Sequence, residues 1–125
     1  MDKTALVSFD IDMGQRVVQA LEAADLSPDV ALWAILPEYE DWRLVLASKN
    51  LDPRTSGTSA MNSALRVANL GWNSRPTLLL RRMEDPFIEA LRRNFARTAD
   101  TYGMRLGGQK FGNQYIEDAF VYRIR

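Results

Sequence analysis

The feature that most constrains the fold is an apolar segment that doubles back on itself between residues 30 and 47. Residues 30–36 (VALWAIL) are apolar at every position, which is typical of a strand that is covered on both faces. A polar turn at residues 37–41 follows, and residues 42–47 return as a second, mainly apolar arm. Two such arms joined by a short turn form an antiparallel β-hairpin. We therefore predict a mainly antiparallel sheet built around this hairpin.

Two amphipathic helices are predicted on either side of the hairpin, because apolar residues recur at helical spacing in residues 11–24 and 60–72. Asp12 is the expected N-cap of the first helix, although Asp10 would serve equally. At the edge of the second helix, Ala60 and Gly71 are expected to allow close approach of the backbone to a sheet. Its predicted core stripe is Met61, Ala64, Leu65, Ala68 and Trp72.

A third helix is predicted to begin at Asp85 and Pro86, because proline's missing N–H costs nothing at the first helical position. Gly103 is its expected end. The last strand is predicted over residues 116–124, where Phe120, Tyr122 and Ile124 alternate with Ala119, Val121 and Arg123. Residues 4–9 fit a short strand and an extension of the first helix equally well.

With a further apolar strand at residues 76–83, these elements predict one α+β domain over residues 1–125. The expected architecture is a single-layer, mainly antiparallel sheet of about five strands with three helices packed on it. A chain of this size buries enough surface on folding for one core without covalent staples.

The composition excludes several classes of chemistry. The chain has no Cys and no His, which removes disulfides, thiolate catalysis, histidine acid–base roles and the common zinc and haem sites. No metal or cofactor is predicted. The sequence contains neither a secretory leader nor an apolar run of about 18 residues, so we expect a cytoplasmic protein without a membrane segment.

Charge is distributed unevenly although the formal net charge is +0. Residues 1–62 carry 5 basic and 10 acidic groups, whereas residues 63–125 carry 11 basic and 6 acidic groups. Arginine binds carboxylate and phosphate through two parallel hydrogen bonds. We therefore take arginines of the basic half, residues 63–125, as the candidate binding residues. These residues are Arg81, Arg82, Arg92, Arg93, Arg97 and Arg105.

Two aspartates near the N-terminus provide the one enzymatic alternative. The segment around Asp10 and Asp12 (LVSFDIDMG) resembles the first motif of the haloacid dehalogenase superfamily. That resemblance implies a Mg²⁺-dependent phosphohydrolase in which Asp10 is the nucleophile and Asp12 the acid or base. The superfamily requires parallel strands joined by helical crossovers, whereas residues 30–47 predict an antiparallel hairpin.

Two other polar segments are more simply explained as turns. The acidic residues of segment 38–41 (EYED) are typical of a solvated hairpin tip, because no further oxygen ligands are spaced to complete a cation site. The glycines of segment 103–112 do not match the spacing of a phosphate-binding loop. We expect Trp33, Trp42 and Trp72 to pack in the core or on the sheet.

The two arms of the hairpin (ALW at 31–33 and WRLV at 42–45) and the closing segment YIEDAFVYR (115–123) resemble an uncharacterised family of small bacterial proteins. The resemblance covers most of the chain and implies an α+β fold in a bacterial cytoplasmic protein. The family has no assigned activity, so no catalytic or binding residue is transferred from it.

The functional hypothesis is therefore a non-catalytic module that binds a protein partner or itself, because aromatic residues and arginine are enriched at interfaces. If the strand 116–124 ends the sheet, its free edge predicts a two-fold homodimer by strand pairing. The alternatives are an arginine-dependent nucleic-acid binder and the phosphohydrolase that uses Asp10 and Asp12. A pI near 6.3 lacks the basic character expected of a nucleic-acid domain.

Overall fold

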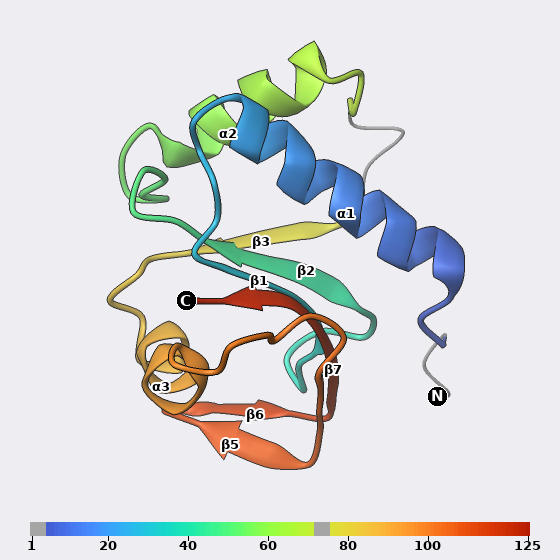
Figure 1. Cartoon of the computed structure of the whole chain (residues 1–125), viewed down its shortest axis with the longest axis vertical. Helices are drawn as coiled ribbons and strands as arrows, with labels where there is room; N and C mark the ends of the chain where they lie inside the picture. The colour runs from blue at the N-terminus through green and yellow to red at the C-terminus, as the bar shows by residue number, and fades with distance from the viewer. Residues whose placement is uncertain (1–4, 72–75) are drawn as a thin grey trace.

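The computed structural model of the protein describes residues 5–71 and 76–125. Within these residues a five-stranded sheet has the order β3-β2-β1-β7-β4, and a separate two-stranded sheet pairs β5 with β6 (Figure 1). The elements in chain order are α1 (Ser8–Ala23), β1 (Val30–Ile35), β2 (Arg43–Ala47), α2 (Gly57–Val67), β3 (Leu78–Arg81), α3 (Pro86–Phe95), β4 (Arg105–Leu106), β5 (Gln109–Phe111), β6 (Gln114–Ile116) and β7 (Asp118–Ile124).

The predicted hairpin and fold class are confirmed. β1 pairs antiparallel with β2 in a register that places Val30 opposite Ala47 and Ala34 opposite Arg43. Only β2 and β3 run parallel, and α2 forms the crossover between them. The sheet is therefore mainly antiparallel, in an α+β fold with three helices among the described residues.

The helices divide between the two faces of the sheet. α1 and α2 lie on one face, whereas α3 and the β5–β6 hairpin cover the other (Figure 1). All six residues of β1 are buried, because its alternate side chains enter two separate cores. Ala31 and Trp33 belong to the core between the sheet and helices α1 and α2, while Val30 and Leu32 belong to the core between the sheet and α3. This explains why the β1 segment is apolar at every position.

A β-bulge in β7 changes the predicted alternation of the last strand. Val121 pairs with Leu32 and Arg123 with Ala31, so Tyr122 is the extra residue between them. Beyond the bulge, the side chains change faces, and Ile124 therefore joins the core between the sheet and α3 instead of the core that contains Tyr122. The expectation that Tyr122 and Ile124 share a face is wrong for this reason.

The strand predicted to end the sheet is an interior strand. β7 pairs with β1 on one side and, over Ala119 and Phe120, with β4 on the other. The residues just before β4 bond to the backbone of Val121 and Ile124, so this edge of β7 is occupied. β3 and β4 are the edges of the five-stranded sheet. The predicted homodimer by pairing along residues 116–124 therefore lacks its structural basis.

The third helix begins as predicted but ends earlier. The Asp85 side chain caps it by accepting a hydrogen bond of 2.9 Å from the backbone N–H of Phe87. The helix stops at Phe95, well before Gly103. Thr101 is buried, and its hydroxyl accepts a hydrogen bond from the backbone N–H of Ile124. This contact with β7 requires a non-helical chain at a point where the sequence pattern favours a helix.

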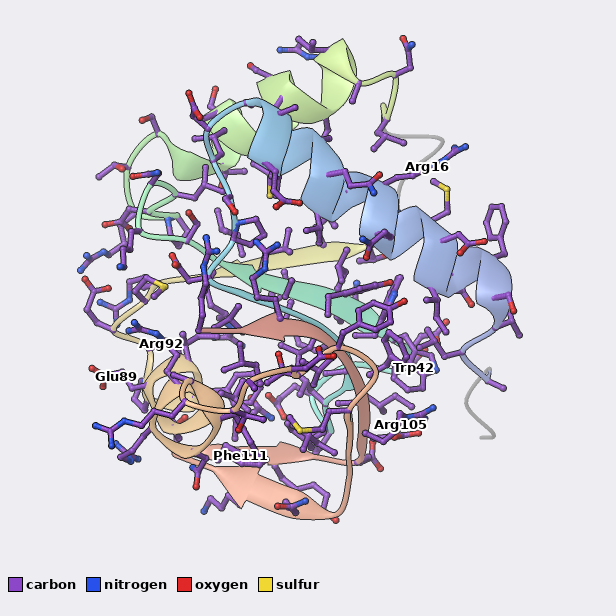
Figure 2. All side chains as sticks on the ribbon, viewed as in Figure 1. Arg16, Trp42, Glu89, Arg92, Arg105 and Phe111 are labelled. Carbon is purple, nitrogen blue, oxygen red and sulfur yellow. The ribbon has the colours of Figure 1, made fainter. Side chains whose placement is uncertain are left out.

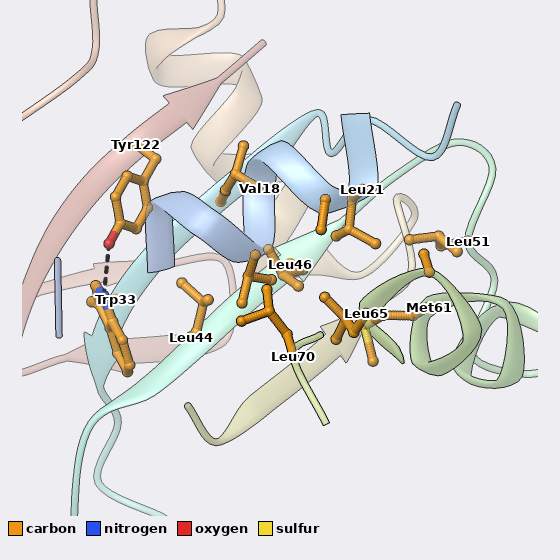
Figure 3. Close-up of a cluster of buried hydrophobic side chains, with 14 of the residues drawn as sticks. Val18, Leu21, Trp33, Leu44, Leu46, Leu51, Met61, Leu65, Leu70 and Tyr122 are labelled. Atoms are coloured by element: carbon orange, nitrogen blue, oxygen red, sulfur yellow. Dashed lines mark hydrogen bonds between the residues drawn. The ribbon is translucent and has the colours of Figure 1, made fainter. Parts of the chain in front are cut away.

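α1 rests on the sheet through a close contact at Gly14. The Trp33 indole Nε1 donates a hydrogen bond of 2.9 Å to the Tyr122 hydroxyl, which in turn donates to the backbone carbonyl of Ile11 at 2.6 Å (Figure 3). A Cβ atom on Gly14 would lie 2.7 Å from the Tyr122 ring and 2.9 Å from Trp33 Nε1. By contrast, no atom of residues 5–71 and 76–125 lies within 4 Å of the Cβ position of Gly71, so these residues do not make the close approach predicted there.

Tyr122→Phe tests this contact. Burial raises the pKa of the Tyr122 hydroxyl above its ordinary value of 10.0. The unfolded chain releases this proton at a lower pH than the folded protein. The contribution of the Tyr122 hydroxyl to the free energy of unfolding is therefore complete below pH 10 and decreases as the pH rises above it. We expect Tyr122→Phe to lose about 1–2 kcal/mol at pH 7, because Trp33 Nε1 and the carbonyl of Ile11 lose their partner. The variant should also show a shallower decline in stability above pH 10.

The measurement is urea denaturation at intervals between pH 7 and pH 11. Tyr115→Phe is the matched control, because Tyr115 is 44% exposed and removal of its hydroxyl should change neither value. An unchanged alkaline decline in Tyr122→Phe would contradict the assignment of that decline to the buried hydroxyl.

Candidate functional site

The six candidate arginines do not share one surface. Arg81 lies on the edge strand β3, whereas Arg105 lies on β4 at the opposite edge of the sheet. Each forms an ion pair: Arg81 with Asp85 at 3.4 Å, and Arg105 with Asp118 at 2.7 Å. These two arginines hold neighbouring elements of the fold together.

The remaining arginines are distributed over the α3 side of the molecule. Arg92 Nε donates a hydrogen bond of 2.8 Å to the backbone oxygen of Arg125, on the side of the molecule opposite Arg105 (Figure 2). Arg93 and Arg97 are exposed on α3 and just beyond it. The predicted binding set is thus divided between opposite edges of the sheet and α3, so its six members do not form the one continuous basic surface expected of a nucleic-acid binder.

Asp10 and Asp12 lie within α1 and not at the end of a strand. Residues 5–7 are neither helix nor strand, and the helix begins at Ser8. The N-cap of α1 is Val7, so neither Asp12 nor Asp10 holds the N-cap position predicted for it. Asp10 is the third residue of the helix, and its side chain accepts a hydrogen bond of 3.1 Å from the backbone N–H of Val7. Residues two apart on a helix point to different sides, so the two carboxylates do not converge on one magnesium ion. The structural context that phosphohydrolase chemistry needs is therefore absent from this segment.

The acidic hairpin tip is also used structurally. Glu38 accepts a hydrogen bond of 3.0 Å from the Gln114 side chain, and Asp41 accepts one of 2.7 Å from the backbone N–H of Trp42. In the described part of the chain, no three acidic side chains are grouped to hold a metal ion. Trp33 and Trp42 are buried in the core, as predicted, while Trp72 lies outside the described residues.

A small polar cleft of about 200 Å³ opens where the parallel strands β2 and β3 end. Ser48 lines it, but its hydroxyl donates to the backbone oxygen of Ser27 at 3.0 Å and accepts from the backbone N–H of Asn50. The Asp52 carboxylate forms an ion pair with Arg54, and the hydrogen bond from the Arg54 side chain lowers the pKa of Asp52. The cleft carries both signs of charge, because Lys49, Arg82 and Glu84 also line it.

An apolar groove of about 550 Å³ lies between α1 and α2. Its deepest residues, Ala20 and Ala64, are each 8% exposed and also contribute to the core. Val67 stands at its rim with 87% of its surface exposed. The complete lining, which we call the α1–α2 groove, is Ala20, Ala23, Ala24, Leu26, Ala60, Ser63, Ala64, Val67 and Ala68.

The α1–α2 groove exists because each helix carries two apolar stripes. Large side chains such as Leu21 and Leu65 face the sheet and anchor the helices there (Figure 3). A second stripe of small residues at spacings of three and four lies on another face of each helix. Small side chains leave space between the helices that larger ones would fill, and the groove is that space.

Positive charge lies at one end and along the rim of the groove. A neighbouring hollow of about 430 Å³ shares Ala20 and Ala68 with it and is lined by Arg16. Arg16 is exposed, and it makes no ion pair with any residue that the structure describes. Arg66 donates a hydrogen bond of 3.2 Å to the Ser63 hydroxyl on the groove wall. The charged groups nearest to these apolar walls are thus cations at this end.

Sequence reasoning missed this site because it assigned Ala64 and Ala68 to the core stripe of the second helix. Ala68 is exposed, and Ala64 lies at the base of the groove. The available signal was the second, small-residue stripe in both helices, with the exposed Val67 beside it. A stripe of alanines fits close helix packing as well as a groove, so the pattern alone did not distinguish the two.

Within residues 5–71 and 76–125, no helix combines the length and apolar character needed to cross a membrane. Comparison with family models, with curated proteins and with solved structures finds no match to this chain.

Proposed function

We propose that this protein is a non-catalytic, cytoplasmic protein-binding module and that the α1–α2 groove is its binding surface. The observation that carries the proposal is the groove itself. Its volume of about 550 Å³ lies within the range of roughly 300–1,000 Å³ that is typical of ligand sites. Its walls are almost entirely apolar and remain open to solvent.

The chemistry of the walls favours a protein partner over a small polar substrate. Ser63 supplies the one side-chain hydroxyl of the lining, and no titratable side chain enters it. A site with a single hydroxyl and no titratable group is poorly suited to orient a polar substrate or move a proton, whereas it can bury apolar side chains of a partner. A groove between two helices is the geometry in which an amphipathic helix buries its apolar face.

The test places a charge inside the groove without disturbing the core. Ala68→Glu is suitable because Ala68 is exposed on the groove wall. Helical peptides selected from a displayed library for binding to the unmodified protein should bind Ala68→Glu at least about tenfold more weakly. The reason is that an unpaired carboxylate would be buried against the apolar face of the peptide.

The matched control is Ala99→Glu, since Ala99 is an exposed alanine that does not line the groove. The selected peptides should bind this variant as they bind the unmodified protein. Two results would each overturn the proposal: a library that yields no binding peptide, or selected peptides whose affinity is the same for both variants.

A further inference from the structure

We infer that the partner of the α1–α2 groove is an amphipathic helix of another protein that carries large apolar anchors and acidic residues next to them. This inference rests on the proposed function and specifies the partner. It follows from three properties of the groove: its concave shape, its length and the charges around it.

The concave shape argues against a second copy of this chain as the occupant. The groove walls are small residues, and Val67 is the one large side chain among them that protrudes. Two copies placed face to face would oppose two hollows of about 550 Å³ each, with only one valine from each copy to fill them. Unfilled apolar space forfeits dispersion contacts, so a stable interface needs larger side chains from the partner.

The length of the groove matches about two helical turns. Its α2 wall extends from Ala60 to Ala68, and the eight steps of about 1.5 Å between these residues span about 12 Å. A partner helix lying along it would place side chains at positions i, i+3 or i+4, and i+7 against the walls. Leucine, methionine or phenylalanine at these positions would occupy the space that the alanines leave.

The charged side chains beside the groove indicate which residues should flank the apolar anchors of that helix. Arg16 and Arg66 are exposed cations beside the groove, and Arg16 has no ion-pair partner among the described residues. Glu22 of α1 already pairs with Arg123 at 3.0 Å. Asp25 is an exposed carboxylate between two lining residues, at the end of the groove away from Arg16. Acidic residues next to the apolar anchors at the Arg16 end would gain two ion pairs, whereas basic residues there would be repelled.

The experiment compares three peptides that share leucine at positions i, i+3, i+4 and i+7 and differ only in their flanking residues. The flanks are glutamate, glutamine or lysine, and binding is followed by fluorescence anisotropy and by ¹H–¹⁵N NMR of the protein. We expect the glutamate peptide to bind about fivefold more tightly than the glutamine peptide and at least about tenfold more tightly than the lysine peptide, because exposed ion pairs contribute modestly.

The double variant Arg16→Gln/Arg66→Gln should bind the glutamate and glutamine peptides equally. Arg93→Gln is the control, because Arg93 is an exposed arginine on α3, on the other face of the sheet. It should retain the fivefold preference. Higher salt should reduce the preference in the unmodified protein, since exposed charges are screened.

The outcomes separate this inference from the proposed function. Equal binding of the three peptides at a groove that Ala68→Glu blocks would overturn the acidic partner and leave the protein-binding function standing. Failure of every peptide to perturb groove residues would overturn both. Sodium dodecanoate, a fatty-acid salt, is the probe for a lipid occupant: groove resonances that respond to it more strongly than to any peptide would overturn the protein partner. A dimer in light scattering that Ala68→Glu dissociates would also overturn it, because a second copy would then occupy the groove.

Discussion

Gly14→Ala is expected to destabilise the protein by about 3 kcal/mol, although alanine is the better helix former. The added Cβ would lie 2.7 Å from the Tyr122 ring and 2.9 Å from Trp33 Nε1, so α1 must move away from the sheet. That movement stretches the hydrogen bond from the Tyr122 hydroxyl to the carbonyl of Ile11. Overpacking and a weakened buried hydrogen bond together outweigh the gain of about 1 kcal/mol in helix propensity.

Gly71→Ala is the matched control for this prediction. It makes the same chemical change where no atom lies within 4 Å of the new Cβ, so stability should change little. Urea denaturation of both variants beside the unmodified protein measures the difference. If Gly14→Ala were as stable as Gly71→Ala, α1 would not be seated on Tyr122 and Trp33 as described.

Gly112→Ala is expected to cost about 3 kcal/mol as well, for two reasons that add. Gly112 has a φ of 61°, in the left-handed region, where any other L-residue is strained by about 1–2 kcal/mol. The new Cβ would also lie 2.7 Å from the carbonyl carbon of Pro86 and 3.1 Å from the backbone nitrogen of Phe87. These are backbone atoms of the first turn of α3, which cannot rotate away as a side chain can.

Gly103→Ala separates the two contributions. Gly103 has a φ of 81° but no atom within 4 Å of its Cβ position, so only the backbone strain should appear. Thermal or urea denaturation should therefore rank the unmodified protein first, Gly103→Ala second and Gly112→Ala third. Equal losses in the two variants would show that contact with α3 contributes nothing at Gly112.

These contacts also bear on the proposed binding surface. The α1–α2 groove is formed by two helices that are anchored on the sheet by large buried side chains, among them Leu21 and Leu65. A site whose walls are held by a packed core loses little conformational entropy when a partner binds. For this reason we expect Gly14→Ala, which displaces α1, to weaken binding of the glutamate-flanked peptide, and Gly112→Ala to leave it unchanged once the protein is folded.

The parts of the fold that were predictable from sequence depend on neighbouring residues. The hairpin over residues 30–47 follows from two apolar arms and a short polar turn, and the start of α3 follows from Asp85 and Pro86. Each signal acts over a few residues, so the rest of the chain has little influence on it. The three helices and the mainly antiparallel sheet were predicted correctly on that basis.

The errors occur where distant contacts override the local pattern. α3 ends at Phe95, and beyond it Thr101 bonds to Ile124, a partner 23 residues away that no local pattern specifies. The interior place of β7 depends on its pairing with both β1 and β4, which no local pattern specifies. The bulge at Tyr122, which reverses the faces of the final residues, likewise arises from pairing across the sheet.

For the candidate site the division is similar. Composition alone excludes histidine and cysteine chemistry, and apolar periodicity alone predicts α1 and α2 as amphipathic helices. The dispersal of the six arginines, the bond of Asp10 to Val7, and the two stripes of small residues that face one another across a groove become visible in the folded chain. Side-chain identity limits chemistry locally, whereas a binding surface depends on which distant residues the packed core brings together.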